Sequence, residues 1–342
     1  MPNRRCTSGL HFTRAWVVKP FVRFLEGQGY PSERGLLEVH LSPDLLEDDD
    51  AIVPIRPAIA FIERASRAEG IDHLGLRVAE TVTVDELGSM QSLMVRSRNL
   101  NEYLESACRL AGSITTSARY AVCVSGDTAH FHYGTLDVGN PVHGHLFTLD
   151  VTINTLRALA GESWSPAELV LPAGTAEGLA AISSAFEDAR VDRSARSASF
   201  AFPRSFLALP APRPSETSDV PLDADLARPD AGGFRDAVRR LVECLILEGF
   251  ADVHTAADAA GMSVRTFQRR LAECGLVFTR LVQEARIEVA QRWLREEGRP
   301  VNEIANALGY TDAANFTRAF RRLNGLSPSA FKASLEGEVR AP

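Results

Sequence analysis

Two short segments near the C-terminus carry side chains that suit hydrogen bonding to nucleic-acid bases. The first holds Arg265, Gln268 and Arg269, and the second holds Asn315 and Arg318. Arginine can bond to both O6 and N7 of guanine, and glutamine can bond to N6 and N7 of adenine. These side chains must project from an element narrow enough to enter the major groove, as an α-helix is. The pattern therefore predicts two DNA-reading helices.

Both segments belong to a repeated unit, which predicts helix-turn-helix motifs at about 255–274 and 303–322. The repeat reads Ala256-Ala257-x-x-Ala260-Gly261-Met262-Ser263 and then Ile304-Ala305-x-x-Leu308-Gly309-Tyr310-Thr311. Ala257 and Ala305 are small residues at the positions where the two helices of each unit are expected to cross. Each glycine can take the positive φ that ends a helix sharply. Ser263 and Thr311 are expected to cap the amides at the start of the next helix.

The region after residue 233 predicts an all-α domain. Its expected helices are 234–247, 255–260, 264–274, 279–296, 301–308 and 312–323. The helix at 279–296 would be about 27 Å long. With packing at its ends, such a rod can hold two recognition helices close to one DNA turn, ~34 Å, apart.

Residues from about 235 to 333 resemble the AraC/XylS family of bacterial transcription regulators. The resemblance rests on the repeated unit, on the text around Phe267 and Phe316, and on Asn324-Gly325-Leu326-Ser327-Pro328 followed by Phe331-Lys332. It implies base contacts at Arg265, Gln268 and Arg269. It also implies an activator that binds double-stranded promoter DNA and contacts RNA polymerase.

Outward-facing positions of the two recognition helices supply the candidate DNA contacts. Predicted base contacts are Arg265, Thr266, Gln268, Arg269, Ala314, Asn315, Thr317 and Arg318. Predicted phosphate contacts are Ser263, Arg270, Thr311, Arg321 and Arg322. Alanine offers only a methyl contact, and both Ala313 and Ala314 lie at the start of the second helix. We therefore expect the first unit to dominate sequence discrimination.

The chain as a whole predicts an α+β sensor domain at 1–209, a linker at 210–232 and the helical DNA-binding domain at 233–342. Helices are expected at 17–25, 57–68, 101–111 and 146–159, a hairpin at 118–136 and a strand at 168–171. Prolines recur from Pro203 to Pro229, and proline removes backbone donors, so the linker should be extended.

The N-terminal domain also resembles the ligand-binding, dimerising domain of one AraC subgroup. The shared text is Leu74-Gly75-Leu76-Arg77, Leu87-Gly88, Phe202-Pro203 and Leu209-Pro210. The resemblance implies a homodimer that responds to a small-molecule effector, without naming that molecule. Trp16, Phe147 and Trp164 could line an effector pocket, although core packing would explain them equally well.

Two other functions remain open for the N-terminal domain. His130, His132, His143 and His145 could hold a divalent metal, which would make the protein a metal-responsive regulator. An enzyme domain fused to a DNA-targeting module is the second alternative. The sequence has no Ser-His-Asp order, nucleotide-binding glycine loop or H-E-x-x-H motif, so we expect no catalytic residue, no metal ligand and no cofactor.

Composition and charge place any DNA binding in the C-terminal third. The 342 residues carry a net charge of −7. Residues 233–342 hold 16 basic and 14 acidic side chains, a net charge of +2, whereas residues 1–232 hold 21 and 30, a net charge of −9. The five cysteines form no C-x-x-C pair, and no run is apolar enough for a signal or a membrane span. A cytoplasmic protein without membrane partners is expected.

Overall fold

The computed structural model describes residues 10–135, 138, 141–172, 182, 185–186, 189–195, 197–213, 234–247, 251–296 and 299–338. It divides the chain into an N-terminal unit, His11–Ala231, and a C-terminal unit that includes Gly232–Pro342. The predicted α+β and all-α classes of these two regions are confirmed. Among the described helices, none combines the length and apolarity needed to cross a bilayer.

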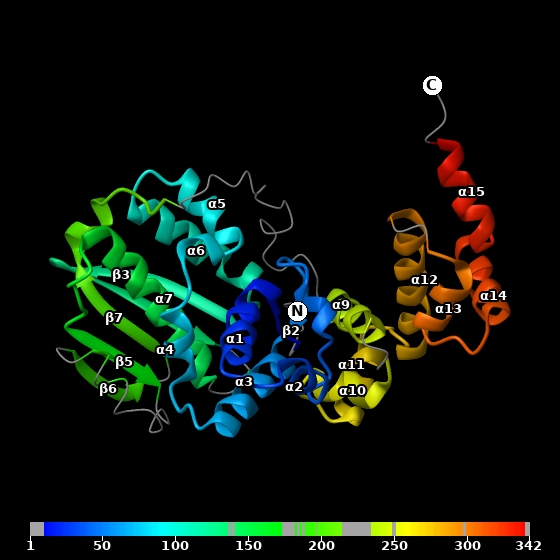
Figure 1. The fold of residues 1–342 in the computed structure, drawn as a ribbon, viewed down its shortest axis with the longest axis horizontal. Coiled ribbons are helices and arrows are strands. Elements are labelled where there is room, and N and C mark those ends of the chain that lie inside the picture. The colour runs from blue at the N-terminus through cyan, green and yellow to red at the C-terminus, as the bar shows by residue number, and fades with distance from the viewer. Residues whose placement is uncertain are drawn as a thin grey trace, which may run out of the picture. The chain divides into compact units, whose positions relative to one another are not determined.

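A five-stranded sheet of order β3-β4-β7-β5-β6 forms one side of the N-terminal unit (Figure 1). Its strands are β3 (Ala118–Ser125), β4 (Thr128–Thr135), β5 (Glu168–Pro172), β6 (Arg190–Ala195) and β7 (Ala198–Pro203). The expected hairpin is β3–β4, which turns at Gly126 with a φ of +60°. β4 pairs antiparallel with β7, β7 antiparallel with β5, and β5 parallel with β6.

Two long helices pack against this sheet, α6 (Leu100–Ile114) and α7 (Val142–Ala160). Alternation along β4 buries Ala129, Phe131 and Tyr133 on one face, where they join a core with Leu104 and Leu156. The other face of β4 is only half-buried, as the pleat of a strand requires.

Residues 12–96 build a second, mainly helical layer. Its elements are β1 (Phe12–Arg14), α1 (Ala15–Gly27), α2 (Ser32–Leu37), β2 (Ile52–Pro54), α3 (Ile55–Glu69), α4 (Leu74–Ala79) and α5 (Ser89–Arg96). Short 3-10 helices also lie within the described part of this unit, at Pro43–Leu46, Val84–Glu86 and Arg204–Ala208. Val18, Phe21, Phe61 and Leu74 form a core of their own, into which Phe147 of α7 also packs.

Gly75 sets how closely α4 approaches α7. A Cβ atom added at Gly75 would lie 2.1 Å from the backbone oxygen of His143. Only glycine permits this approach, which gives a physical reason for a glycine in the text Leu74-Gly75-Leu76-Arg77.

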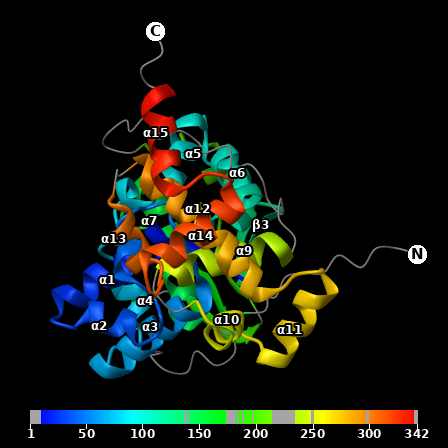
Figure 2. The same cartoon turned by 90° about the vertical axis from the view of Figure 1, so that its right-hand side faces the viewer.

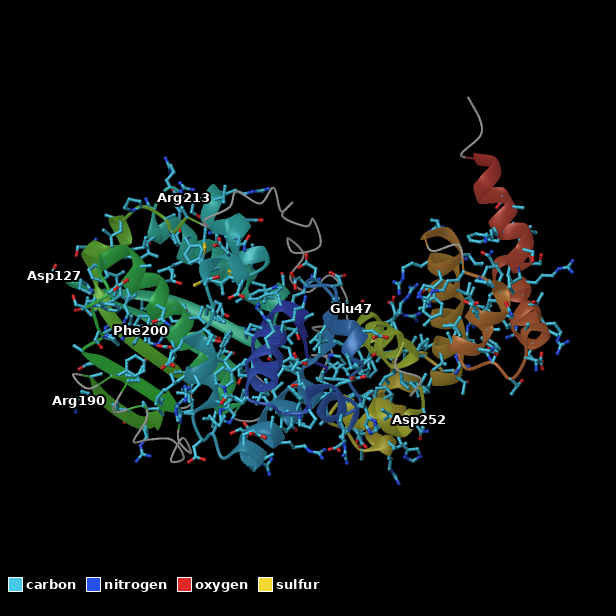
Figure 3. The ribbon with its side chains drawn as sticks, viewed as in Figure 1. Glu47, Asp127, Arg190, Phe200, Arg213 and Asp252 are labelled. Carbon is cyan, nitrogen blue, oxygen red and sulfur yellow. The ribbon has the colours of Figure 1, made fainter. Side chains whose placement is uncertain are left out.

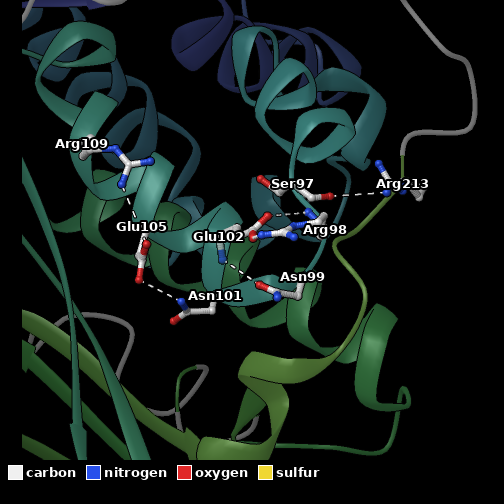
Figure 4. A network of polar contacts seen from close by, with 8 residues as sticks. All are labelled: Ser97, Arg98, Asn99, Asn101, Glu102, Glu105, Arg109 and Arg213. Carbon is white, nitrogen blue, oxygen red and sulfur yellow. Dashed lines mark hydrogen bonds and ion pairs between the residues drawn. The ribbon is translucent and has the colours of Figure 1, made fainter.

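The start of the predicted linker is bound to the N-terminal unit. Arg213 (labelled in Figure 3) donates through Nη1 to the backbone oxygens of Val95 at 2.7 Å and Met94 at 3.2 Å. Its Nη2 donates to the backbone oxygen of Ser97 at 3.4 Å, as Figure 4 shows. Pro210 pairs with Asn99, whose side chain caps α6 through the amide of Glu102 at 3.0 Å. Folded structure thus continues to residue 213, past the expected boundary at 209. Residues 214–232 of the predicted linker lie outside the described residues.

Every regular element among the described residues of the C-terminal unit is a helix. They are α9 (Phe234–Leu247), α10 (Val253–Ala259), α11 (Val264–Glu273), α12 (Phe278–Glu296), α13 (Val301–Ala307), α14 (Ala313–Asn324) and α15 (Pro328–Glu338). Six of them match the expected helices to within two residues at each end, and α15 was not predicted. α9 packs along α12, where Arg292 pairs with Glu243 at 2.8 Å.

Candidate nucleic-acid interface

Helices α10–α11 and α13–α14, labelled in Figure 2, form two helix-turn-helix units whose first helices end in the same way. Gly261 has a φ of +65° and Gly309 a φ of +73°, as the sequence predicts. The amide of Met262 donates to Ala257 and that of Tyr310 to Ala305, both at 2.9 Å. Each bond runs from the residue after the glycine to the carbonyl four residues before the glycine, as in a Schellman motif, so α10 and α13 end in the same way.

The two recognition helices are capped differently. The Ser263 hydroxyl accepts the Thr266 amide at 3.3 Å, which confirms the predicted cap. The cap of α14 is Asp312, whose carboxylate accepts the Asn315 amide at 2.6 Å. The prediction of Thr311 as that cap is wrong, because the second turn is one residue longer. The Thr311 hydroxyl instead accepts from the Asn315 side-chain amide at 2.9 Å.

This difference gives the helix N-termini different charges. A helix N-terminus with a neutral cap offers a partial positive charge and free amides to a phosphate. The carboxylate of Asp312 occupies that position in α14, whereas α11 has only the Ser263 hydroxyl. Electrostatics therefore favours a phosphate at the start of α11 over one at the start of α14.

α11 presents an open polar face on a fixed core. Phe267 and Leu271 are buried, and Phe267 packs edge-on against Phe234 and Phe278. The predicted base contacts Arg265, Gln268 and Arg269 are exposed, and Thr266 is half-buried. Arg269 lies 3.6 Å from Glu273 in an exposed ion pair, which solvent screens and a DNA base could displace at small cost.

The polar side chains of α14 are largely engaged within the helix. Asn315 donates to Asp312 at 2.7 Å as well as to Thr311, and Arg318 donates to the Asn315 side-chain oxygen. The Thr317 hydroxyl donates to the Ala313 backbone at 2.7 Å. A base would have to replace these bonds, which supports the expectation that α11 discriminates more strongly.

The predicted phosphate contacts differ in how accessible they are. Arg321 and Arg322 are exposed, and Arg322 donates to Gln283 of α12 at 2.9 Å. Arg270 is half-buried, and its buried Nη1 has no hydrogen-bond partner among the described residues. None of these observations tests DNA contact itself, so the contacts remain predictions.

Sequence reasoning missed the contact that ties α12 to the second turn. The Arg286 guanidinium lies 5.4 Å from the ring centre of Tyr310, in a cation–π arrangement. A Cβ atom at Gly309 would meet Nη2 of Arg286 at 3.3 Å. Tyr310 also packs edge-on against Phe316 at 5.3 Å, so Arg286 braces the core of this unit. No sequence pattern within the predicted helix 279–296 distinguishes Arg286 from the other arginines there.

The four histidines of the metal-responsive alternative do not come together in one site. His130 and His132 share the half-buried face of β4, with ring centres 6.2 Å apart. His145 of α7 contacts Tyr133 on the opposite face of that strand, and His143 lies 4.0 Å from Glu63 of α3. No group of three or more His, Cys, Asp or Glu side chains within the described ranges could hold a metal. The metal-responsive alternative is therefore wrong in the form the sequence suggested.

Two of the three aromatic residues considered for an effector pocket line a cavity. Trp16 and Phe147 border a space of about 130 Å³ inside the N-terminal unit. Trp164 does not line this cavity and packs against Phe206 at 5.3 Å.

Paired turns, capped recognition helices and a connecting helix define the C-terminal unit as a helix-turn-helix domain, and a family model of that description matches residues 256–334. The model of the arabinose-binding domain of the AraC transcription regulator matches residues 29–211. The chain belongs to the AraC family of transcription regulators. The resemblance stated from the motifs is thereby confirmed.

Individual relatives resemble parts of the chain. An uncharacterized HTH-type transcriptional regulator of Mycobacterium tuberculosis is 36% identical over 137 residues, 38% of this chain and 39% of its own. The HTH-type transcriptional regulator VqsM of Pseudomonas aeruginosa is 34% identical over 105 residues, 31% of this chain and 32% of its own. These alignments thus span about two fifths or less of the relatives' length. The crystal structure of the regulator CdpR from Pseudomonas aeruginosa aligns with 92% of this chain and 97% of its own, with a TM-score of 0.42 and 20% identity.

Proposed function

We propose that this protein is a sequence-specific DNA-binding transcription regulator that reads bases mainly through α11. The observation that carries the proposal is the exposed face formed by Arg265, Gln268 and Arg269 on a helix whose other face is fixed by buried Phe267. Arginine and glutamine at such positions can recognise guanine and adenine edges. Arg318 and Asn315 of α14 then add a second, weaker set of contacts, and Ser263, Arg270, Arg321 and Arg322 hold the DNA backbone.

The proposal extends to how the protein acts in the cell. The N-terminal unit would serve as a sensor and not as an enzyme: it binds a small molecule, pairs two chains into a homodimer and alters DNA occupancy. The protein would act on promoter DNA in the cytoplasm and activate transcription through RNA polymerase. A relative named Transcriptional activator NphR, from Rhodococcus, supports activation, since it is 30% identical over 95 residues.

Selection of bound duplexes from a random pool by the full-length chain tests DNA recognition. Arg269→Ala should lower affinity for the selected site by about 1–3 kcal/mol and relax the preference at one base pair. Arg34→Ala is the matched control, because Arg34 forms a comparable exposed i,i+4 pair with Glu38 in the N-terminal unit. The assignment fails if the Arg269 variant selects the same sequence with the same affinity.

Activation and pairing need separate readouts. A reporter driven by the selected site should gain transcription when the intact protein is present, and sedimentation should give twice the mass of one chain. Loss of reporter signal on adding the protein would identify a repressor instead.

A further inference from the structure

The cavity of the N-terminal unit lies at the seam between its two cores. Phe21, Ala58 and Ile62 line it from the helical layer, and Leu104 and Phe131 line it from the core under the sheet. Val151 of α7 packs against both cores and borders the same space. A cavity between two separately packed cores can admit a ligand without disrupting either one.

None of the described residues that line this cavity carries a charged side chain, and few of their polar groups are free. Its polar members are threonines and tyrosines together with Trp16. The hydroxyls of Thr152 and Thr155 donate to the backbone oxygens of Thr148 and Val151, each at 2.8 Å. Thr13 and Thr115 bond to each other at 2.7 Å. Burying an ionic ligand here would leave its charge unpaired, and a sugar would lose the water bound to most of its hydroxyls.

Among the described lining residues, Trp16 alone has a buried donor that lacks a hydrogen-bond partner. The side chain is 8% exposed, and its indole Nε1 makes no hydrogen bond to any described residue. The indole ring of Trp16 packs directly against Gly88, since a Cβ atom added at Gly88 would lie 2.6 Å from the ring. A buried donor without an acceptor costs free energy, which a ligand oxygen beside it would recover.

Trp16 also borders an outer groove of about 490 Å³ whose charge is unfavourable to anions. Six acidic and two basic side chains line that groove, namely Glu26, Glu33, Glu47, Asp49, Asp85 and Glu86 with Lys19 and Arg23. Both basic groups are already paired, Lys19 with Asp49 and Arg23 with Glu86. The groove therefore repels a carboxylate or phosphate on the outer side of Trp16.

We propose that the cavity binds an uncharged, mainly apolar molecule of about one ring's size, whose single acceptor oxygen takes the hydrogen bond of Trp16. The size follows from the cavity volume, because an apolar cavity of roughly 150 Å³ accommodates benzene. The inference rests on the proposed sensor function and names the chemical class of its ligand.

Three ring compounds of similar size test this chemistry on the full-length protein by calorimetry. Acetophenone offers a carbonyl acceptor, isopropylbenzene offers none, and benzoate carries a charge. Acetophenone should bind about tenfold more tightly than isopropylbenzene, as expected for one hydrogen bond, and benzoate should show no binding. Equal binding of benzoate and acetophenone would overturn the proposal, and so would the failure of both acetophenone and isopropylbenzene to bind.

Two variants locate the binding. Trp16→Phe keeps the ring but removes the donor, so acetophenone should bind only as tightly as isopropylbenzene. Val151→Phe should fill the seam and abolish binding of both compounds, with folding checked by circular dichroism. If Trp16→Phe preserves the preference for acetophenone, the assigned hydrogen bond is wrong, whatever the outcome for Val151→Phe.

Measuring DNA occupancy in the same samples separates this inference from the sensor proposal. Acetophenone that binds as expected but leaves occupancy unchanged supports the ligand class and contradicts an effector role for the cavity. If none of the ring compounds binds while a charged metabolite changes occupancy, the ligand class is wrong and the sensor function stands.

Discussion

Replacing Gly75 by alanine should destabilise the N-terminal unit by forcing α4 away from α7. The new Cβ atom would lie 2.1 Å from the His143 oxygen and 2.9 Å from its carbonyl carbon, against an ordinary contact of 3.4 Å or more. The obstructing atoms are backbone atoms in a 19-residue helix, so no rotamer change can relieve the clash. Overpacking usually costs 1–3 kcal/mol, and we expect Gly75→Ala to cost about 3 kcal/mol or more.

Thermal unfolding of the full-length protein, followed by circular dichroism, measures this effect. A loss of about 3 kcal/mol corresponds to a fall in Tm of roughly 6–12 °C for a unit of this size. Gly144→Ala in α7 is the matched control, because its Cβ would have its nearest neighbour, Pro141, at 3.7 Å. Alanine there should be neutral or stabilising by up to about 1 kcal/mol. The reasoning fails if both variants unfold at the same temperature.

Two further predictions concern charge. Burial lowers the pKa of His143 and of His145 to about 4, so both are neutral in the folded state. Their contribution to stability should therefore be lost as the pH falls from about 6.5 towards 4. Burial raises the pKa of Asp150 to about 6, which changes stability in the opposite direction, but this is one group against two. Urea unfolding from pH 7 to 4.5 should therefore show a decline that His143→Gln with His145→Gln makes shallower, and an unchanged slope in that double variant would refute the assignment. Asp312→Ser keeps a cap on α14 but removes its carboxylate, so DNA affinity should rise several-fold at low salt. Ser263→Asp adds a carboxylate at the start of α11 and should lower DNA affinity. Both differences should shrink as added salt screens the charges. Opposite signs in filter binding would contradict the electrostatic argument.

The helices of the C-terminal unit could be predicted because residues close in the sequence determine where each helix ends. Gly261 and Gly309 end helices through their own φ angles, and buried residues recur at helical spacing on α11 and α14. The cap of α14 was wrong for an equally local reason. Aligning the second turn on the first placed Thr311 where Ser263 stands, although the longer turn brings Asp312 into the capping position.

Contacts between distant segments could not be predicted from local patterns. The period-two pattern placed His130 and His132 on one face of β4, but only the packing of α7 on the other face separates them from His145. The order of the sheet depends on β6 and β7, which follow each other in the sequence but do not pair with each other. The prolines after Leu209 indicated the absence of a helix, yet they did not reveal that Arg213 binds back to α5 and its C-terminal end.

We propose that one chain reads two successive major grooves, mainly through α11 and more weakly through α14. Hydroxyl-radical footprinting of the full-length protein on its selected site measures this directly. We predict two protected patches per chain whose centres lie about one turn, or 10–10.5 base pairs, apart, and loss of tight binding when five base pairs are inserted between them. A single protected patch per chain, or tight binding that survives the insertion, would contradict the account.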